Sequence, residues 1–171
     1  MAIESLNKEH FISYVSNIFV QINRAVMFKE LEKIKHFVSE GIYNNLNNAV
    51  ETAKNGNYIQ FYDEMNVKDV KIITTRDTDD STQIEVSLTS RYMDFRMRDG
   101  KVISGDNKNT IIRNYKMIFS RKKNYREQPR ARFCPGCGAN IDVNRNGNCS
   151  YCGATYNLED MDWVVVEFET Y

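Results

Sequence analysis

Four cysteines near the C-terminus carry the clearest chemical signal in this sequence. They form two Cys-x-x-Cys pairs, each followed by glycine and separated by eleven residues: Cys134, Cys137, Cys149 and Cys152. Each pair makes a turn that brings two thiolates together, and two such turns give the tetrahedral sulfur coordination that suits zinc. The pattern therefore predicts one zinc ion in a small ribbon. Iron in a rubredoxin-like site and redox disulfides are the alternatives.

A closed site of four thiolates leaves no position for water or substrate, so the predicted ion is structural rather than catalytic. All four cysteines lie within 19 residues, which indicates a reducing compartment. The N-terminus has no basic region followed by an apolar stretch, and no run of about 18 apolar residues occurs. We therefore expect a cytoplasmic protein without a transmembrane segment, with peripheral contact at a membrane as the alternative.

The basic segment before the ribbon is a second candidate site. From Lys108 to Arg132 there are nine basic residues and one acid, although the whole chain is balanced at 23 basic and 23 acidic residues. The candidate anion-binding residues are Arg121, Lys122, Lys123, Arg126, Arg130 and Arg132. They could contact nucleic acid or an anionic membrane. A solvated linker whose charge balances the thiolates and the acidic C-terminal segment is the simpler interpretation.

The N-terminal third predicts helices. Apolar residues recur at helical spacing from Phe11 to Val26, and a shorter stretch continues the period to Val38. We expect the first stripe to be core, although it could also bind a partner helix. Ser39 is a plausible N-cap for a third helix, which residues 55–57 should end because Gly56 tolerates a left-handed backbone.

From Val67 onward the apolar period changes to two, which predicts strands. Asp99-Gly100 is typical of a tight hairpin turn. The apolar phase slips after Leu88, which predicts a β-bulge near residues 90–92. Helices first and strands afterwards indicate an α+β fold, with N-terminal helices packed on one face of a curved antiparallel sheet.

Several loose motifs spread along the chain resemble the C-terminal domain of the mitochondrial inner-membrane translocase subunit Tim44, and in particular its bacterial zinc-ribbon relatives. The motifs are residues 19–25 and 30–34, 92–95 with 99–105, 115–121, and 163–166. The resemblance implies a cone-like fold similar to nuclear transport factor two, which encloses an apolar pocket. It also implies that the ribbon, residues 124–161, is inserted before the last strand of a domain formed by residues 1–123 and 162–171.

The function that this resemblance favours is a non-catalytic binding or scaffold module, similar to translocase-type transport proteins. Its partner would be a protein, a peptide or a lipid. A pocket enzyme is the alternative, because proteins of this cone fold can use a buried Asp or His as a base. Asp94 is the candidate base, with Tyr92 on the same strand face, and His10 and His36 are the only imidazoles.

Overall fold

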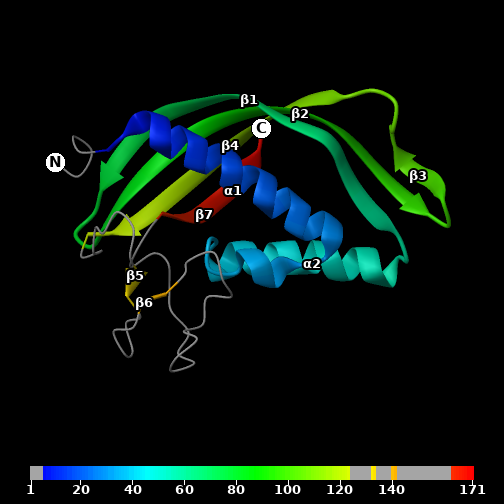
Figure 1. Ribbon diagram of the computed structural model, residues 1–171, viewed down its shortest axis with the longest axis horizontal. Coiled ribbons are helices and arrows are strands. Elements are labelled where there is room, and N and C mark those ends of the chain that lie inside the picture. Colours follow the sequence, from blue (N-terminus) through cyan, green and yellow to red (C-terminus); the bar gives the residue numbers. More distant parts are fainter. Residues whose placement is uncertain (1–5, 124–131, 134–139, 142–162) are drawn as a thin grey trace.

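The computed structural model describes residues 6–123, 132–133, 140–141 and 163–171. Helices come first and strands follow, as predicted (Figure 1). The helical elements are α1 (Lys8–Phe28), the 3-10 helix η1 (Leu31–Ile34) and α2 (Glu40–Asn55). The strands are β1 (Ile59–Asp77), β2 (Ser81–Arg98), β3 (Lys101–Gly105), β4 (Ile111–Lys122), β5 (Arg132–Phe133), β6 (Asn140–Ile141) and β7 (Val164–Thr170).

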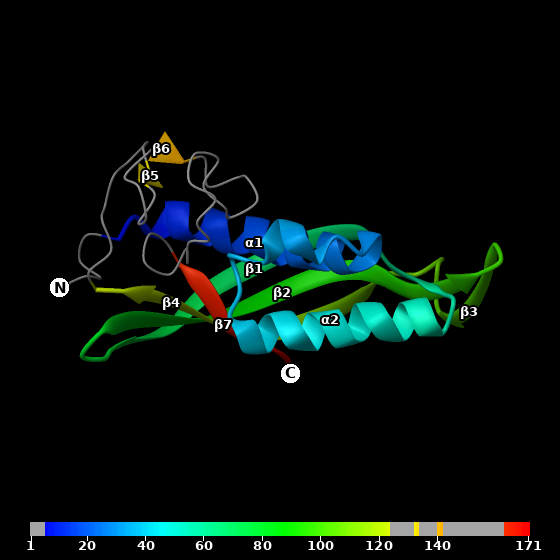
Figure 2. The same ribbon diagram turned by 90° about the horizontal axis from the view of Figure 1, so that it is seen from below.

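Five strands form one antiparallel sheet in the order β1-β2-β4-β7, and β3 pairs with the distal part of β2. Strands β1 and β2 are long and arch over α1 and α2 (Figures 1 and 2). The α+β class and the curved antiparallel sheet with its helices are therefore confirmed. Strands β4 and β7 are antiparallel neighbours, with Ser120 opposite Val164.

Helix α1 supplies much of the core, which confirms that its apolar stripe is a packing surface. The buried apolar residues of the stripe are Phe11, Val15, Ile18, Phe19, Ile22 and Val26. Phe11 contacts Phe119 of β4 and Trp163 edge to face, and Phe19 contacts Tyr115 in the same manner. These contacts fix α1 across β4 and β7, on the face of the sheet that we call the concave face.

Helix α2 begins as predicted and ends differently. The Ser39 side chain accepts a hydrogen bond from the backbone N–H of Ile42, which confirms the N-cap. The prediction that Gly56 takes the left-handed conformation is wrong, because Gly56 has φ −79° and Asn57 has φ 51°. Asparagine tolerates this region better than most residues. A Cβ on Gly56 would lie 2.7 Å from the Tyr58 ring, so the glycine provides space instead.

The predicted β-bulge lies in the neighbouring strand. Strand β1 begins at Ile59, well before the predicted Val67. Its register against β2 shifts at three places, and the first shift, between Asp63 and Asn66, lies opposite Tyr92, where Glu64 has φ 51°. Strand β2 pairs with β4 without interruption from Ser81 to Tyr92. The change in apolar phase along β2 has another cause, which is that its distal residues are buried on the opposite face of the sheet. On that face Phe95 stacks on Phe61 with ring centroids 4.9 Å apart.

Gly105, at the end of β3, is required by close approach of the backbone. It has φ +79°, and an added Cβ would lie 2.2 Å from the carbonyl oxygen of Asp94. We expect Gly105→Ala to lower the free energy of unfolding by about 2–4 kcal/mol. The cost of the left-handed backbone at alanine and the cost of the steric clash both contribute. Urea denaturation would measure this change.

Gly41→Ala is the matched control, because an added Cβ there meets nothing within 4 Å in the first turn of α2. It should stabilise the protein by about 0.5 kcal/mol through helix propensity. Equal stability of the Gly105→Ala protein and the parent would contradict the assignment.

Candidate ligand-binding site

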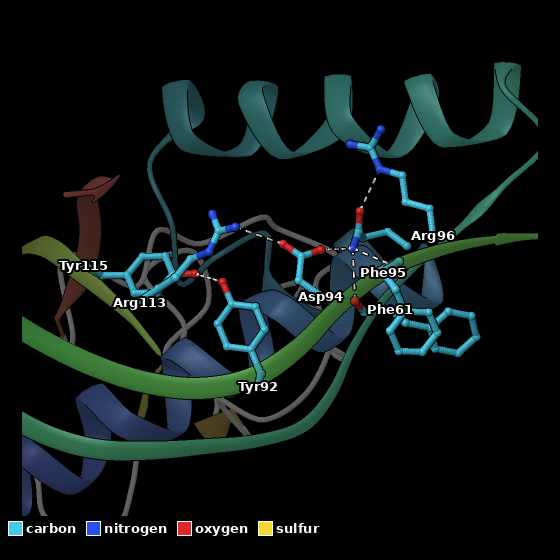
Figure 3. Close-up of polar contacts among 8 residues, drawn as sticks. Phe61, Tyr92, Asp94, Phe95, Arg96, Arg113 and Tyr115 are labelled. Atoms are coloured by element: carbon cyan, nitrogen blue, oxygen red, sulfur yellow. Dashed lines mark hydrogen bonds and ion pairs between the residues drawn. The ribbon is translucent and has the colours of Figure 1, made fainter. Parts of the chain in front are cut away.

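A group of polar side chains lies on the concave face, where β1, β2 and β4 run side by side. Alternation along each strand and the register between strands place these residues on one face: Tyr62, Tyr92, Asp94, Arg113 and Tyr115. We call them the concave cluster. The charged side chains extend from the sheet toward α2 (Figure 3). The predicted placement of Tyr92 and Asp94 on one strand face is thus confirmed.

Asp94 is held by two donors. Gln60 donates from Nε2 to Oδ1 at 2.8 Å, and Arg113 donates from Nη2 to Oδ2 at 3.4 Å. Gln60 is itself fixed, because its Oε1 accepts from Nε of Arg96 at 3.0 Å (Figure 3). The Asp94 side chain is 28% exposed and that of Arg113 is 46% exposed, so solvent reaches the charged part of the cluster.

The tyrosines form the buried part of the cluster. The hydroxyls of Tyr92 and Tyr115 share a hydrogen bond of 2.5 Å, and the Tyr62 ring meets the Tyr92 ring edge to face. Burial, reinforced by the negative charge of Asp94, raises the pKa of Tyr62 to about 12. Burial also raises the pKa of Tyr92 and of Tyr115. All three phenols are therefore neutral near pH 7.

Asp94, the candidate base of the pocket-enzyme alternative, is engaged on both of its oxygens. Each oxygen accepts one hydrogen bond, and one of the two donors is a guanidinium. Of the two histidines, His10 is exposed in the first turn of α1, and His36 is half-buried in the turn between η1 and α2.

The described part of the basic segment belongs to the sheet. Arg121 and Lys122 end β4, and the Arg121 guanidinium lies 4.4 Å from the centroid of the Trp163 ring. This cation–π contact places Arg121 in the packing against the closing strand. Lys123 is exposed and donates its backbone N–H to Asp80. Arg126 and Arg130 lie outside the described residues, and of Arg132 only the backbone pairing in β5 is described.

The predicted metal ligands, Cys134, Cys137, Cys149 and Cys152, all lie outside the described residues. Within residues 6–123, 132–133, 140–141 and 163–171, no group of three or more His, Cys, Asp or Glu side chains could hold a metal ion. The short strands β5 and β6 are antiparallel, and Phe133 is paired with Asn140. These paired ends border the six residues that contain the first Cys-x-x-Cys pair.

Gln60, Arg113 and Tyr115 are site residues that the sequence analysis did not select. A signal for Arg113 does exist in β4, because it alternates in phase with Tyr115, Met117 and Phe119, which are buried. A charge at an inward position of a strand is unusual and indicates a buried or ligand-facing site.

Helices lying within the arch of a curved antiparallel sheet, with a partly exposed polar cluster on its concave face, define a domain of the α+β class. A scan against protein families matches residues 2–130 of the 171 to the Tim44-like domain. The chain belongs to this family, as its motifs predicted. Membership supports a translocase-related, non-catalytic module.

A search of curated proteins finds no significant match to the chain. Among the helices in the described ranges, none combines the length and the apolar character needed to span a membrane.

Proposed function

We propose that this protein is a non-catalytic binding module that holds an apolar ligand between α2 and the concave face of the sheet. The partial burial of α2 carries this proposal. Of the 16 residues of α2, only Val50 and Ala53 are buried. Ile42 and Leu46 contact the core but remain half-buried. An amphipathic helix normally buries its apolar stripe, so this stripe leaves apolar surface for a ligand.

A lipid tail or an apolar peptide segment would fit this surface. The sheet contributes the aromatic rings of Tyr62 and Tyr92, which contact each other edge to face on the opposite side of the site. Aromatic and aliphatic walls with a few polar groups are typical of small-ligand pockets. The polar groups here would be those of Asp94 and Arg113, which solvent reaches.

The zinc ribbon would be a structural part of the same module. We propose that the four cysteines bind one zinc ion and that residues 124–161 form an insertion between β4 and β7. The antiparallel pairing of β4 with β7 supports a looped-out insertion. The pairing of Phe133 with Asn140 supports a hairpin that carries the first two ligands at its end. Four thiolates suit zinc, which would supply folding energy to the ribbon.

Native mass spectrometry of the purified full chain tests the ligand proposal. We expect an added mass that matches an apolar ligand, and saturable binding of the neutral apolar dye Nile red. Leu46→Glu places a charge on the half-buried stripe of α2 and should weaken dye binding about tenfold. Asn47→Glu, one residue further along on the exposed side, is the control and should bind as the parent does.

Equal dye affinity of the Leu46→Glu and parent proteins would place the binding surface elsewhere. Absence of both a co-purified ligand and saturable dye binding would reject the proposed pocket.

A further inference from the structure

The buried part of the concave cluster contains hydroxyl groups whose hydrogen-bonding capacity is only partly used. Tyr92 and Tyr115 are 1% and 5% exposed, and their hydroxyls share one hydrogen bond. When one hydroxyl donates to the other, the accepting hydroxyl still has its own hydrogen to donate. That second O–H requires a further acceptor. Ser90, on the same face of β2, is fully buried, and its hydroxyl has no partner among the described residues. Buried polar groups of this kind normally bind a partner.

Arg113 adds further donors at the exposed end of the cluster. A guanidinium carries five N–H donors. Within the described part of the chain, Arg113 has one ion pair, the 3.4 Å contact to Asp94. The other oxygen of Asp94 accepts from Gln60, whose own Oε1 accepts from Arg96, so a second guanidinium belongs to the same network. Two cations against one anion leave a net charge of +1 at this end.

We propose that the concave cluster binds the carboxylate of an apolar monocarboxylic acid, with its hydrocarbon chain beneath α2. This inference rests on the proposed function and names the class of ligand. A carboxylate has two acceptor oxygens and a planar geometry that matches a guanidinium. One oxygen accepts from Arg113, and the other accepts the spare O–H of the tyrosine pair. A single negative charge balances the site, whereas a phosphate would bring excess charge against Asp94.

Isothermal titration calorimetry of the full chain with decanoate and with 1-decanol tests this assignment. The two probes share a hydrocarbon tail and differ in the head group. We expect the parent to bind decanoate about tenfold more tightly than 1-decanol, the size of a partly exposed charge-assisted hydrogen bond. Arg113→Leu should abolish this preference, because decanoate loses its charged donor.

Arg91→Leu is the matched control. Arg91 is also an exposed arginine of the sheet with one side-chain hydrogen bond, to Thr110, but it lies on the opposite face of β2. Its replacement should retain the preference for decanoate. Tyr115→Phe keeps the ring and removes the hydroxyl, so it should reduce the preference to a few-fold. Circular dichroism checks that each variant folds. If Arg113→Leu does not fold, the preference of Tyr115→Phe for decanoate over 1-decanol tests the carboxylate site.

The outcomes separate this inference from the proposed function. Equal binding of decanoate and 1-decanol by the parent, or a preference that survives in Arg113→Leu and Tyr115→Phe, rejects carboxylate recognition but supports the apolar site. Failure of both probes to bind rejects the apolar site and the carboxylate site together.

Discussion

Replacing Cys137 by serine is expected to remove the bound metal from the purified protein. The parent should carry one zinc ion per chain, and the variant should carry almost none, because a hydroxyl does not replace a thiolate ligand at neutral pH. Cys149→Ser should behave in the same way, since each variant leaves one Cys-x-x-Cys pair incomplete. Native mass spectrometry with elemental analysis measures the loss.

Metal loss should also unfold the ribbon, because zinc supplies the folding energy of such small modules. We therefore expect protease cleavage within about residues 132–160, with the sheet domain left intact. Ser150→Ala, inside the second Cys-x-x-Cys pair, changes no ligand and should keep its zinc. Full zinc occupancy in Cys137→Ser would reject the four-thiolate site. A parent without metal, and lighter by the hydrogens lost on oxidation, would show disulfides instead.

The second large effect is expected in the core beneath α1. Phe119 on β4 is fully buried and contacts the rings of Phe11 and Tyr14 edge to face. Phe119→Ala removes these contacts and leaves a cavity, so it should lower the free energy of unfolding by about 3–5 kcal/mol. Chemical denaturation followed by circular dichroism would measure this loss, which is a large part of the stability of a typical domain.

Ile112→Ala is the control for Phe119→Ala. Ile112 lies on the same strand but is 67% exposed, so its truncation should change the stability by less than about 0.5 kcal/mol. A small effect at Phe119 would mean that α1 does not rest on β4, and the position of α1 across the sheet would be wrong.

Local patterns were sufficient to predict most elements of the fold. The helical spacing from Phe11 to Val26, the N-cap at Ser39 and the turn at Asp99-Gly100 each depend on residues close together in the chain. The structure confirms all three. The sequence does not predict the start of β1, because apolar and polar residues do not alternate clearly in residues 59–66. Their strand conformation depends on pairing with β2.

The concave cluster could not be assembled from the sequence, because its contacts cross the sheet. Gln60 lies 34 residues from Asp94, and Tyr92 lies 23 residues from Tyr115. Such pairs depend on the register of β1 and β4 against β2. The register of β1 shifts at three places, whereas that of β4 is continuous. The sequence predicts a bulge in β2, because it shows the change of buried face without showing which strand carries the extra residues.

Strand β7 does more than extend the sheet beside β4. The N–H of Val165 donates to the carbonyl of Phe37, and the carbonyl of Val165 accepts from the N–H of Ser39, the residue that caps α2. The start of α2 is thus anchored by a strand that the ribosome makes more than a hundred residues later. The helices and the other four strands of the large sheet, β1 to β4, are therefore made before the strand that completes their pairing. The fixed position of α2 therefore depends on pairing across the full length of the domain, and not on the helical segment alone.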